Sequence, residues 1–305
     1  MKKKCNKNIL NPLLKYRGGK SRELNKYQQY IPEFHTYFEP FLGGGATYFY
    51  LSPKRAYISD INSSLIHFYK SFVQDYPNNL NELHELQRIY DNNRNIFEQR
   101  KIEFPNEHVD DPNDKLYYEI RDIFNGKRAS SLSFSTVYFF INKLAYSGMI
   151  RYNNNGDFNV PYGRYKTFNT YLIKPDHYKL LSTARIMNES YETAFELAKS
   201  NDFIFLDPPY DTKFTDYGNE IFTGDFGEDE HRKLAEDFKN LSSPALMIIS
   251  STELINELYK DYIQGKYFKK YSVNIRNRFK SKAEHLIIAN YEINSIKTRK
   301  NNESI

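Results

Sequence analysis

The chain has 305 residues, 40% of them hydrophobic, and no stretch approaches the roughly 18 consecutive apolar residues of a membrane-spanning helix, so we expect one or two domains and no membrane association. One cysteine, Cys5, excludes an internal disulfide and a cysteine-based zinc cluster, and the seven scattered histidines indicate no metal. The net charge of +5 is concentrated in Arg121 to Lys174 and Gln264 to Lys300, a pattern typical of a polyanion-binding face or of a lysine-rich solvated surface.

Short apolar runs bounded by turn residues are predicted to be buried strands. In chain order they are His35 to Glu39, Ala56 to Asp60, Phe203 to Asp207, Ala245 to Ser250 and Leu286 to Tyr291. Helical patterns follow the second run at Ser63 to Gln74 and the third at Asp229 to Leu241. This alternation predicts an α/β fold with a mostly parallel sheet.

The interval between Asp60 and Phe203 is too long for a single crossover connection. It contains helix-like stretches at Leu80 to Asn92, Lys115 to Phe124 and Ser135 to Tyr146. We therefore predict a sheet domain formed by residues 1–62 and 184–305, with a second, mostly helical domain, residues 63–183, inserted into it.

The end of this insert has the signature of a β-hairpin. Residues 152–161 alternate around Asn155-Gly156, the signal of a type I′ turn. The flanking residues, among them Arg151, Arg164 and Tyr165, are basic and aromatic, which suits contact with phosphates and bases. We predict a protruding hairpin that binds nucleic acid.

A glycine-rich turn follows the first predicted strand. The sequence Glu39-Pro-Phe41-Leu-Gly43-Gly-Gly45 lets the backbone approach a ligand at the carboxyl edge of a parallel sheet, although an isolated glycine turn is often only a loop. Asp60 ends the next strand and is placed to bind the ribose of an adenosine-containing cofactor. The third glycine of a dinucleotide fingerprint is replaced by Tyr48, which disfavours NAD and FAD.

A second motif, Asp207-Pro208-Pro209-Tyr210, follows the strand at residues 203–206. Asp207 and the Pro208 carbonyl can accept hydrogen bonds from an exocyclic amine, and Tyr210 can stack on a planar heterocycle. The prolines fix the backbone, so these acceptors are preorganised. The alternative for so short a motif is an ordinary Asp-Pro turn.

Upstream of both motifs, Lys15-Tyr16-Arg-Gly-Gly-Lys20 places an aromatic ring and cations around a glycine turn. Such a loop can cover a sulfonium by cation–π contact and can bind a carboxylate. Taken in order, the three motifs resemble the Dam-like, α-group family of DNA adenine-N6 methyltransferases. The resemblance spans residues 11–292 and extends to residues 146–153 and 156–165, which look like the recognition hairpin of that family.

The resemblance implies a Rossmann-like methyltransferase sheet with an inserted target-recognition domain, and S-adenosylmethionine as cofactor. The cofactor would lie with its methionine end near Glu39 and the glycine turn and with its ribose on Asp60. The family places an acid–aromatic pair at the adenine of the cofactor, and Ser190-Tyr191 occupies that position here. The implied cofactor-binding residues are Tyr16, Lys20, Glu39, Phe41, Gly43, Gly45, Asp60 and Tyr191.

The resemblance also implies the reaction. Asp207, Pro208 and Tyr210 would hold a flipped adenine of double-stranded DNA, and its N6 would attack the methyl group directly, with no covalent enzyme intermediate. Lys15 and Arg151 match residues that touch bases in GATC-specific members, so the expected target is GATC or a related site. The other implied DNA contacts are Ser147, Met149, Asn153, Pro161 and Arg164.

We further expect a cytoplasmic protein, because no secretory signal is visible. We also expect a monomer or weak dimer, with a cognate restriction endonuclease as a candidate partner. Three alternatives stay open at this point. The same chemistry could act on RNA adenine, cytosine N4 or a glutamine amide; the chain could be a non-catalytic nucleic-acid-binding protein on a methyltransferase fold; or it could be a Rossmann oxidoreductase.

Overall fold

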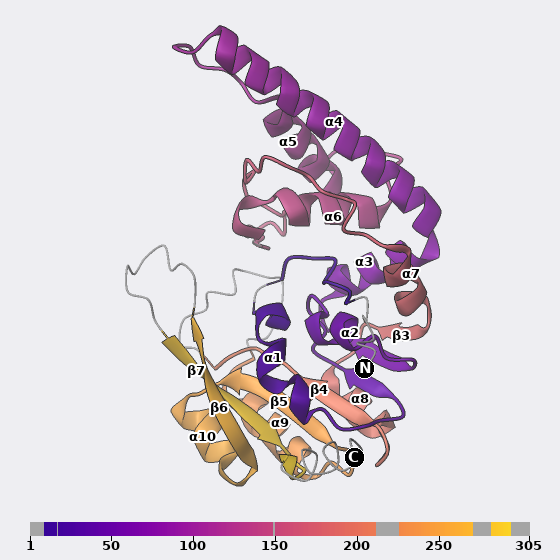
Figure 1. Ribbon diagram of the computed structural model, residues 1–305, viewed down its shortest axis with the longest axis vertical. Helices are drawn as coiled ribbons and strands as arrows, with labels where there is room; N and C mark the ends of the chain where they lie inside the picture. Colours follow the sequence, from indigo (N-terminus) through magenta and orange to yellow (C-terminus); the bar gives the residue numbers. More distant parts are fainter. Residues whose placement is uncertain (1–8, 17, 149, 212–225, 271–281, 294–305) are drawn as a thin grey trace, which may run out of the picture. The chain divides into compact units, whose positions relative to one another are not determined.

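The computed structural model describes residues 9–16, 18–148, 150–211, 226–270 and 282–293. They form two compact units (Figure 1). The first contains the described residues before Lys20 together with Asn62–Ser182, and the second contains Lys20–Ile61 and the described residues from Thr183 onwards. The segment before Lys20 thus groups with the helical insert, whereas the sequence-based boundaries placed it with the sheet.

The second unit is built on a seven-stranded sheet with the order β3-β2-β1-β4-β5-β7-β6. Its strands are β1 Tyr37–Glu39, β2 Ala56–Ser59, β3 Ala184–Met187, β4 Phe203–Leu206, β5 Ala245–Ser250, β6 Ile263–Lys270 and β7 Lys282–Ala289. The first five strands of the order pair in parallel, whereas β7 pairs antiparallel with both β5 and β6. The predicted α/β sheet is confirmed, including all five predicted strands.

Strands β3 and β6 were not predicted, and both lie at an edge of the sheet. An edge strand need not be apolar, because its outer side is open to solvent. Accordingly, none of the β3 residues is fully buried, and β6 has lysines on both sides of the pair Tyr267-Phe268. Neither sequence forms the apolar run that marks a buried strand.

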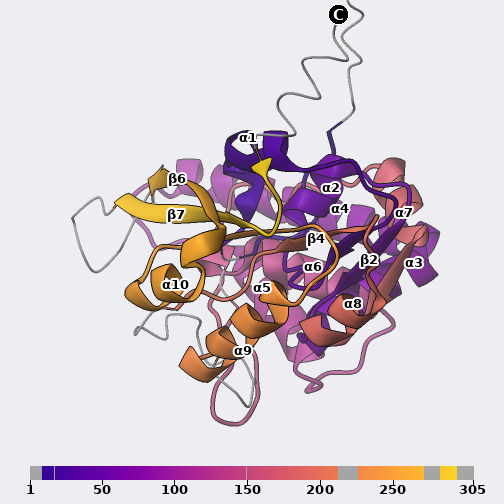
Figure 2. The same ribbon diagram turned by 90° about the horizontal axis from the view of Figure 1, so that it is seen from below.

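Helices cover both faces of this sheet (Figure 2). On one face, Ile204 and Leu206 of β4 pack in a core with residues of α8 Tyr191–Leu197, α9 Glu228–Lys239 and α10 Glu253–Leu258. On the other face, Phe205 stacks on Tyr27 of α1 at 5.4 Å. The remaining elements of this unit are α2 Ala46–Leu51 and the 3₁₀ turns η1 Lys20–Arg22, η2 Gln28–Tyr30 and η4 Lys260–Tyr262, with α1 spanning Leu24–Tyr27. Because β4 is buried on both faces, its sequence is continuously apolar.

The sheet order brings three acids to one edge. Glu39 ends β1, Asp60 directly follows β2 and Asp207 directly follows β4. Since β1 lies between β2 and β4 and all three strands run in parallel, these carboxyl groups share the carboxyl edge of the sheet.

The first unit is mostly helical. Its helices are α3 Ser63–Gln74, α4 Tyr76–Glu103, α5 Pro112–Phe124, α6 Phe134–Leu144 and α7 Pro175–Ser182, with the 3₁₀ turn η3 at Tyr146–Gly148. Polar caps set several helix starts: Asn62 Oδ1 accepts from Leu65 N at 3.0 Å, and Ser133 Oγ accepts from Thr136 N at 3.4 Å. α6 packs against α3, α4 and α5 and is almost entirely buried, so it forms the centre of this unit.

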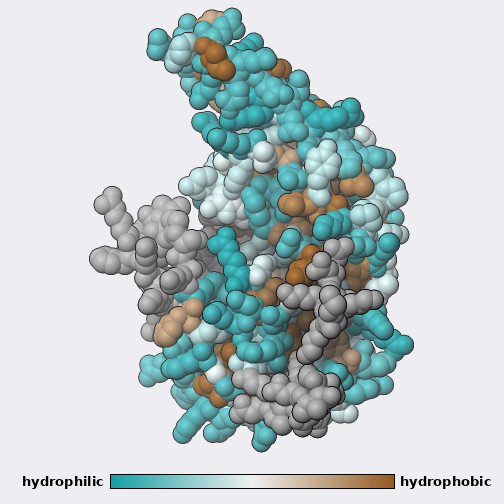
Figure 3. All heavy atoms as spheres, viewed as in Figure 1, coloured by the Kyte–Doolittle hydropathy of each residue, from teal (hydrophilic) through white to brown (hydrophobic). Residues whose placement is uncertain are grey.

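Helix α4 is long but polar. Its buried residues, Asn79, Leu83, Leu86 and Tyr90, follow helical spacing and occupy only its first half. Its far end is mostly hydrophilic on the face in Figure 3, and its last turn contains the exposed Ile102. Within the residues that the structure describes, no helix combines the length and apolar character that crossing a bilayer requires.

The predicted type I′ turn is wrong. Gly156 has a φ of 80°, but Asn155 does not have a positive φ, and Gly156 N donates to Asn153 O at 2.9 Å. This is a four-residue turn over 153–156 with the left-handed residue at its last position, as in a hairpin with a glycine bulge. Among the described residues of this segment, the strand pairing consists of the isolated bridges Tyr152–Phe158 and Ala145–Tyr162. The tip residues Asn154 to Gly156 are exposed, whereas Phe158 and Tyr162 are buried within the first unit.

Candidate active site

Glu39 is a buried carboxyl group at the end of β1. It accepts a hydrogen bond from the Tyr37 hydroxyl at 2.8 Å. Burial raises the pKa of Glu39 to about 8; the Tyr37 hydrogen bond opposes this rise, and the carboxylates of Asp207 and Asp60 add to it. Glu39 is therefore a proton-carrying acid near neutral pH, and a cation placed beside it would favour the ionised form.

The glycine turn after β1 is tied to the end of β2. Gly43 N donates to Asp60 Oδ2 at 2.9 Å, which fixes the carboxylate of Asp60 at the sheet edge. Gly45, with a φ of 66°, caps the start of α2. A Cβ at Gly45 would lie 3.1 to 3.3 Å from side-chain atoms of Phe49 and Leu42. The turn therefore needs glycine here both for its backbone conformation and for space.

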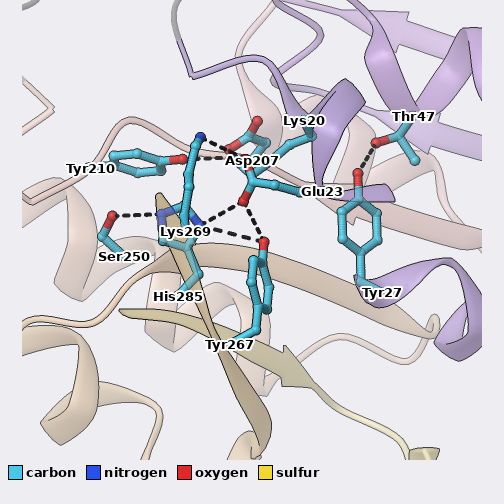
Figure 4. A network of polar contacts seen from close by, with 10 residues as sticks. All are labelled: Lys20, Glu23, Tyr27, Thr47, Asp207, Tyr210, Ser250, Tyr267, Lys269 and His285. Atoms are coloured by element: carbon cyan, nitrogen blue, oxygen red, sulfur yellow. Dashed lines mark hydrogen bonds and ion pairs between the residues drawn. The ribbon is translucent and has the colours of Figure 1, made fainter. Parts of the chain in front are cut away.

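The Asp207-Pro-Pro-Tyr210 motif is joined to the loop of Lys20 (Figure 4). Lys20 is only 2% exposed; its ammonium forms a close ion pair with Asp207 Oδ1 and donates to the Tyr210 hydroxyl at 2.8 Å. Burial raises the pKa of Asp207, and the positive charge of Lys20 opposes this rise. Asp207 itself is 20% exposed, so this loop presents a partly accessible carboxylate held by a buried cation.

Phe41 and Tyr191 stack on one another at 5.8 Å, which brings the glycine turn and the start of α8 together. Asn188 follows β3 and donates through Nδ2 to the Asp60 carbonyl at 2.8 Å. The segment that replaces the acid–aromatic pair thus lies at the same edge as the glycine turn. Within it, Ser190 is the cap residue of α8.

A polar cluster that the sequence did not reveal lies behind the Lys20 loop. Glu23 contacts Tyr267 and Lys269 of β6 and His285 of β7 (Figure 4). The sequence showed these residues only as members of a basic stretch. The cluster could have been inferred from the spacing of Tyr267 and Lys269, because residues two apart lie on the same face of a strand.

The first unit holds Lys15 in a defined position. Its backbone exchanges two hydrogen bonds with the Asn142 side chain, at 2.8 and 2.9 Å. The Lys15 ammonium donates to the Lys143 carbonyl at 2.6 Å and lies 3.8 Å from the centre of the Tyr165 ring. A Cβ at Gly148 would lie 2.9 Å from Lys15, so glycine is required beside it. Lys15 is therefore a preorganised cation.

Two arginines of the predicted nucleic-acid interface are exposed and have side-chain partners. Arg151 Nε donates to Asn159 Oδ1 at 2.8 Å, across the base of the hairpin. Arg164 has a φ of 50° and lies 3.9 Å from Asp114. The side-chain oxygen of Asn153 accepts from two backbone amides of the turn, so this residue shapes the hairpin.

The other predicted contacts of this unit are less informative. Ser147 is exposed with a φ of 58°, and Pro161 is exposed while its carbonyl accepts from Tyr146 N at 2.9 Å. Met149 lies outside the described residues. Tyr16, predicted to cover the cofactor, belongs to the first unit.

A mostly parallel sheet with a glycine turn and acids at its carboxyl edge is typical of the Rossmann-like class of α/β proteins. The family described as D12 class N6 adenine-specific DNA methyltransferase matches residues 16–281, and the chain belongs to this family. The predicted family is thereby confirmed, and the fold is that of an S-adenosylmethionine-dependent methyltransferase.

Similar proteins include the type II methyltransferase M.CviBI of Paramecium bursaria Chlorella virus NC1A, with 35% identity over 92% of this chain and 100% of the relative. The type II methyltransferase M.MjaIII of Methanocaldococcus jannaschii is 30% identical over 92% of this chain and 99% of the relative. A DNA adenine methylase of Vibrio cholerae is 30% identical over 70% of this chain and 71% of the relative. These names point to the same chemistry in proteins of similar length.

Proposed function

We propose that this protein transfers a methyl group from S-adenosylmethionine to N6 of an adenine flipped out of duplex DNA. In this proposal the second unit is the catalytic domain and the first unit is the target-recognition domain. The observation that carries it is the Asp207 carboxylate, held by Lys20 next to the Tyr210 ring at the strand edge that also presents Glu39 and Asp60. Family membership supports the choice of adenine in DNA as substrate.

The residues at this edge fit S-adenosylmethionine. Gly45 lets the turn pack closely on Phe49 and Leu42, and the Asp60 carboxylate is fixed where a ribose hydroxyl would donate to it. Glu39 complements the cationic methionine end, and Phe41 and Tyr191 offer aromatic surface for the adenine. Bound there, the cofactor would supply a methyl group activated by a sulfonium.

The chain itself contributes positioning and electrostatics. Lys20 holds Asp207 Oδ1, so Oδ2 is the oxygen that would accept an N6–H of adenine, and the Pro208 carbonyl would accept the other. These two acceptors favour a nitrogen whose lone pair points at the methyl group, while Tyr210 stacks on the ring. The new bond is N6–C; the carbon–sulfur bond breaks, and N6 then loses one proton to Asp207 or to water.

The direct test is to incubate the protein with unmethylated genomic DNA and methyl-labelled S-adenosylmethionine and to map N6-methyladenine at single-base resolution. We expect one recurring short motif, GATC or a relative. Cofactor binding with no label in DNA would contradict the proposed substrate. A parallel incubation with RNA and with protein then separates another methyl acceptor from the non-catalytic alternative. Because two relatives are named type II methyltransferases, we also propose that the mapped motif is the site of a cognate restriction endonuclease.

Replacing Arg151 with alanine is expected to reduce discrimination between cognate and near-cognate sites by about 1 to 3 kcal/mol, the range for a bidentate contact to a base. The exposed guanidinium is oriented by Asn159, so its fork is directed before DNA binds. The measurement compares kcat/KM on oligonucleotides that differ by single base pairs. Arg151→Lys is the matched control because it keeps the charge and loses the fork. If lysine restores full discrimination, or if alanine changes only the salt dependence of binding, Arg151 is a phosphate contact.

A further inference from the structure

Three neighbouring strands carry a row of polar side chains on one face of the sheet. His285 of β7 is the register partner of Tyr267 on β6 and of Ser250 on β5. The Tyr267 hydroxyl lies 3.5 Å from His285 Nδ1, and the Ser250 hydroxyl lies 3.4 Å from His285 Nε2. Both ring nitrogens of this fully buried histidine therefore face polar partners (Figure 4).

Glu23 joins this row from outside the sheet. Its carboxyl group is buried; Oε2 accepts from the Tyr267 hydroxyl at 2.6 Å and lies 3.1 Å from His285 Nδ1, and Oε1 pairs with the Lys269 ammonium at 2.6 Å. Burial alone would raise the pKa of Glu23, but the hydrogen bond with His285, the charge of Lys20 and the hydrogen bonds from Lys269 and Tyr267 lower it to about 2. Glu23 is therefore a buried anion at every working pH.

The cluster reaches the proposed catalytic residues by two routes. Glu23 N donates to the Lys20 carbonyl at 2.8 Å, so one turn of chain carries both the anion and the cation that binds Asp207. In addition, the His285 ring meets the Tyr210 ring edge-on, with centroids 5.4 Å apart and planes at 77°. A shift of His285 would thus move the ring that faces the target base.

We propose that Glu23 is a positioning residue of the methyl-transfer site: it anchors His285 against Tyr210 and balances the lysines whose charges act on Asp207. This inference rests on the proposed function, since it assumes that Asp207 and Tyr210 hold the adenine. Glu23 does not touch the reacting atoms; it acts through Lys20, Lys269 and His285.

The positioning role of Glu23 can be measured through the charges that act on Asp207. Lys20 and Lys269 lower the pKa of Asp207, whereas Glu23 and burial raise it. Among the described residues, Glu39 on β1, Tyr27 on α1 and Tyr267 on β6 also interact electrostatically with Asp207, and Tyr210 lies in the same loop. Removing the anion at position 23 and removing the cation at position 269 should therefore shift the titration of Asp207 in opposite directions.

The experiment measures single-turnover methyl transfer as a function of pH, with enzyme, S-adenosylmethionine and cognate DNA at saturating concentrations. In Glu23→Gln we expect the rate at the plateau to fall roughly 10- to 100-fold, the range for a misplaced catalytic group. We also expect its acid limb to move to lower pH by about half a unit or more. In Lys269→Met the acid limb should move to higher pH by a similar amount. Lys269 is 16% exposed, so this variant keeps the test open if Glu23→Gln does not fold.

Asp202→Asn is the matched control. Asp202 is a buried acid of the same unit that accepts from Thr36 N and Lys199 N at 3.0 Å, at the opposite end of β4. This variant should lose stability and keep the wild-type rate and pH profile. Wild-type plateau rates in Glu23→Gln, or acid limbs that do not move in either variant, would overturn the positioning role while the proposed function stands. Absence of adenine methylation by the wild-type protein would instead remove the proposed function and this inference with it.

Discussion

Replacing Asp207 with alanine is expected to reduce single-turnover methyl transfer by roughly 10²- to 10³-fold or more, the loss that follows removal of a preorganised group that stabilises developing charge. Asp207 is the partly exposed carboxylate that Lys20 fixes beside Tyr210. Because the glycine turn and Asp60 are untouched, the affinity for S-adenosylmethionine should change only a few-fold. The two quantities are measured by rapid quench and by calorimetric titration of the same preparation.

The same substitution should also destabilise the protein, because it leaves the buried Lys20 ammonium without its carboxylate. Removing one partner of a buried ion pair costs about 3 to 5 kcal/mol, and we expect the lower end because Lys20 keeps the Tyr210 hydroxyl as acceptor. Denaturant unfolding gives this number. The double variant Asp207→Ala, Lys20→Met should recover stability but no activity. A single variant that methylates at a near wild-type rate would show that Asp207 does not hold the reacting amine.

The central strands and the motif order could be predicted from the sequence because each is encoded in a contiguous stretch. β4 and β5 are buried on both faces and therefore read as apolar runs. The glycine turn after β1 and the Asp-Pro-Pro-Tyr motif after β4 occupy loops whose composition is unusual on its own. Parallel pairing then brings Glu39, Asp60 and Asp207 to one edge without further information.

The Glu23 cluster could not be predicted in this way. Glu23, Tyr267 and His285 are far apart in the chain, and each alone has the signature of a solvated surface residue. Only the antiparallel register of β6 and β7 pairs Tyr267 with His285 on one face of the sheet, and Glu23 reaches both from the start of α1. The turn at Asn153 was misread for a related reason: Asn-Gly is a strong hairpin signal, but the side chain of Asn153 captures two backbone amides and shifts the turn by one residue.

Glu39 supplies the second prediction with a large effect: cofactor affinity should increase with pH up to about pH 8. In the protein without cofactor, burial and the neighbouring acids raise the pKa of Glu39 to about 8. The cationic methionine end of S-adenosylmethionine favours the ionised form, so binding at pH 7 must release a proton. The α-amino group of the cofactor titrates alike with the wild type and with Glu39→Gln, so the ratio of their affinities isolates Glu39. Below pH 8 this ratio should rise by up to tenfold per pH unit, and above pH 8 it should level off. Titration calorimetry in buffers of different ionisation enthalpy measures the proton directly.

The control variant Glu39→Gln should bind the cofactor weakly and should lack the proton that Glu39 releases on binding at pH 7. Although it binds the cofactor less tightly, Glu39→Gln should be more stable to unfolding than the wild type at neutral pH. Below pH 4.5 Glu39 is protonated in both the folded and the unfolded chain, so the two proteins should be equally stable; between pH 4.5 and about 8 only the unfolded wild type ionises, so its stability falls with rising pH by about 1.4 kcal/mol per unit. Glu39→Gln escapes this loss and should exceed the wild type most at pH 8 and above. A wild-type affinity that is constant from pH 6 to 9 would show that Glu39 does not pair with the cofactor, and equal stabilities at pH 8 would show that its pKa is not raised. If both predictions hold, burial of Glu39 destabilises the folded chain at neutral pH and at the same time prepares the site for a cation.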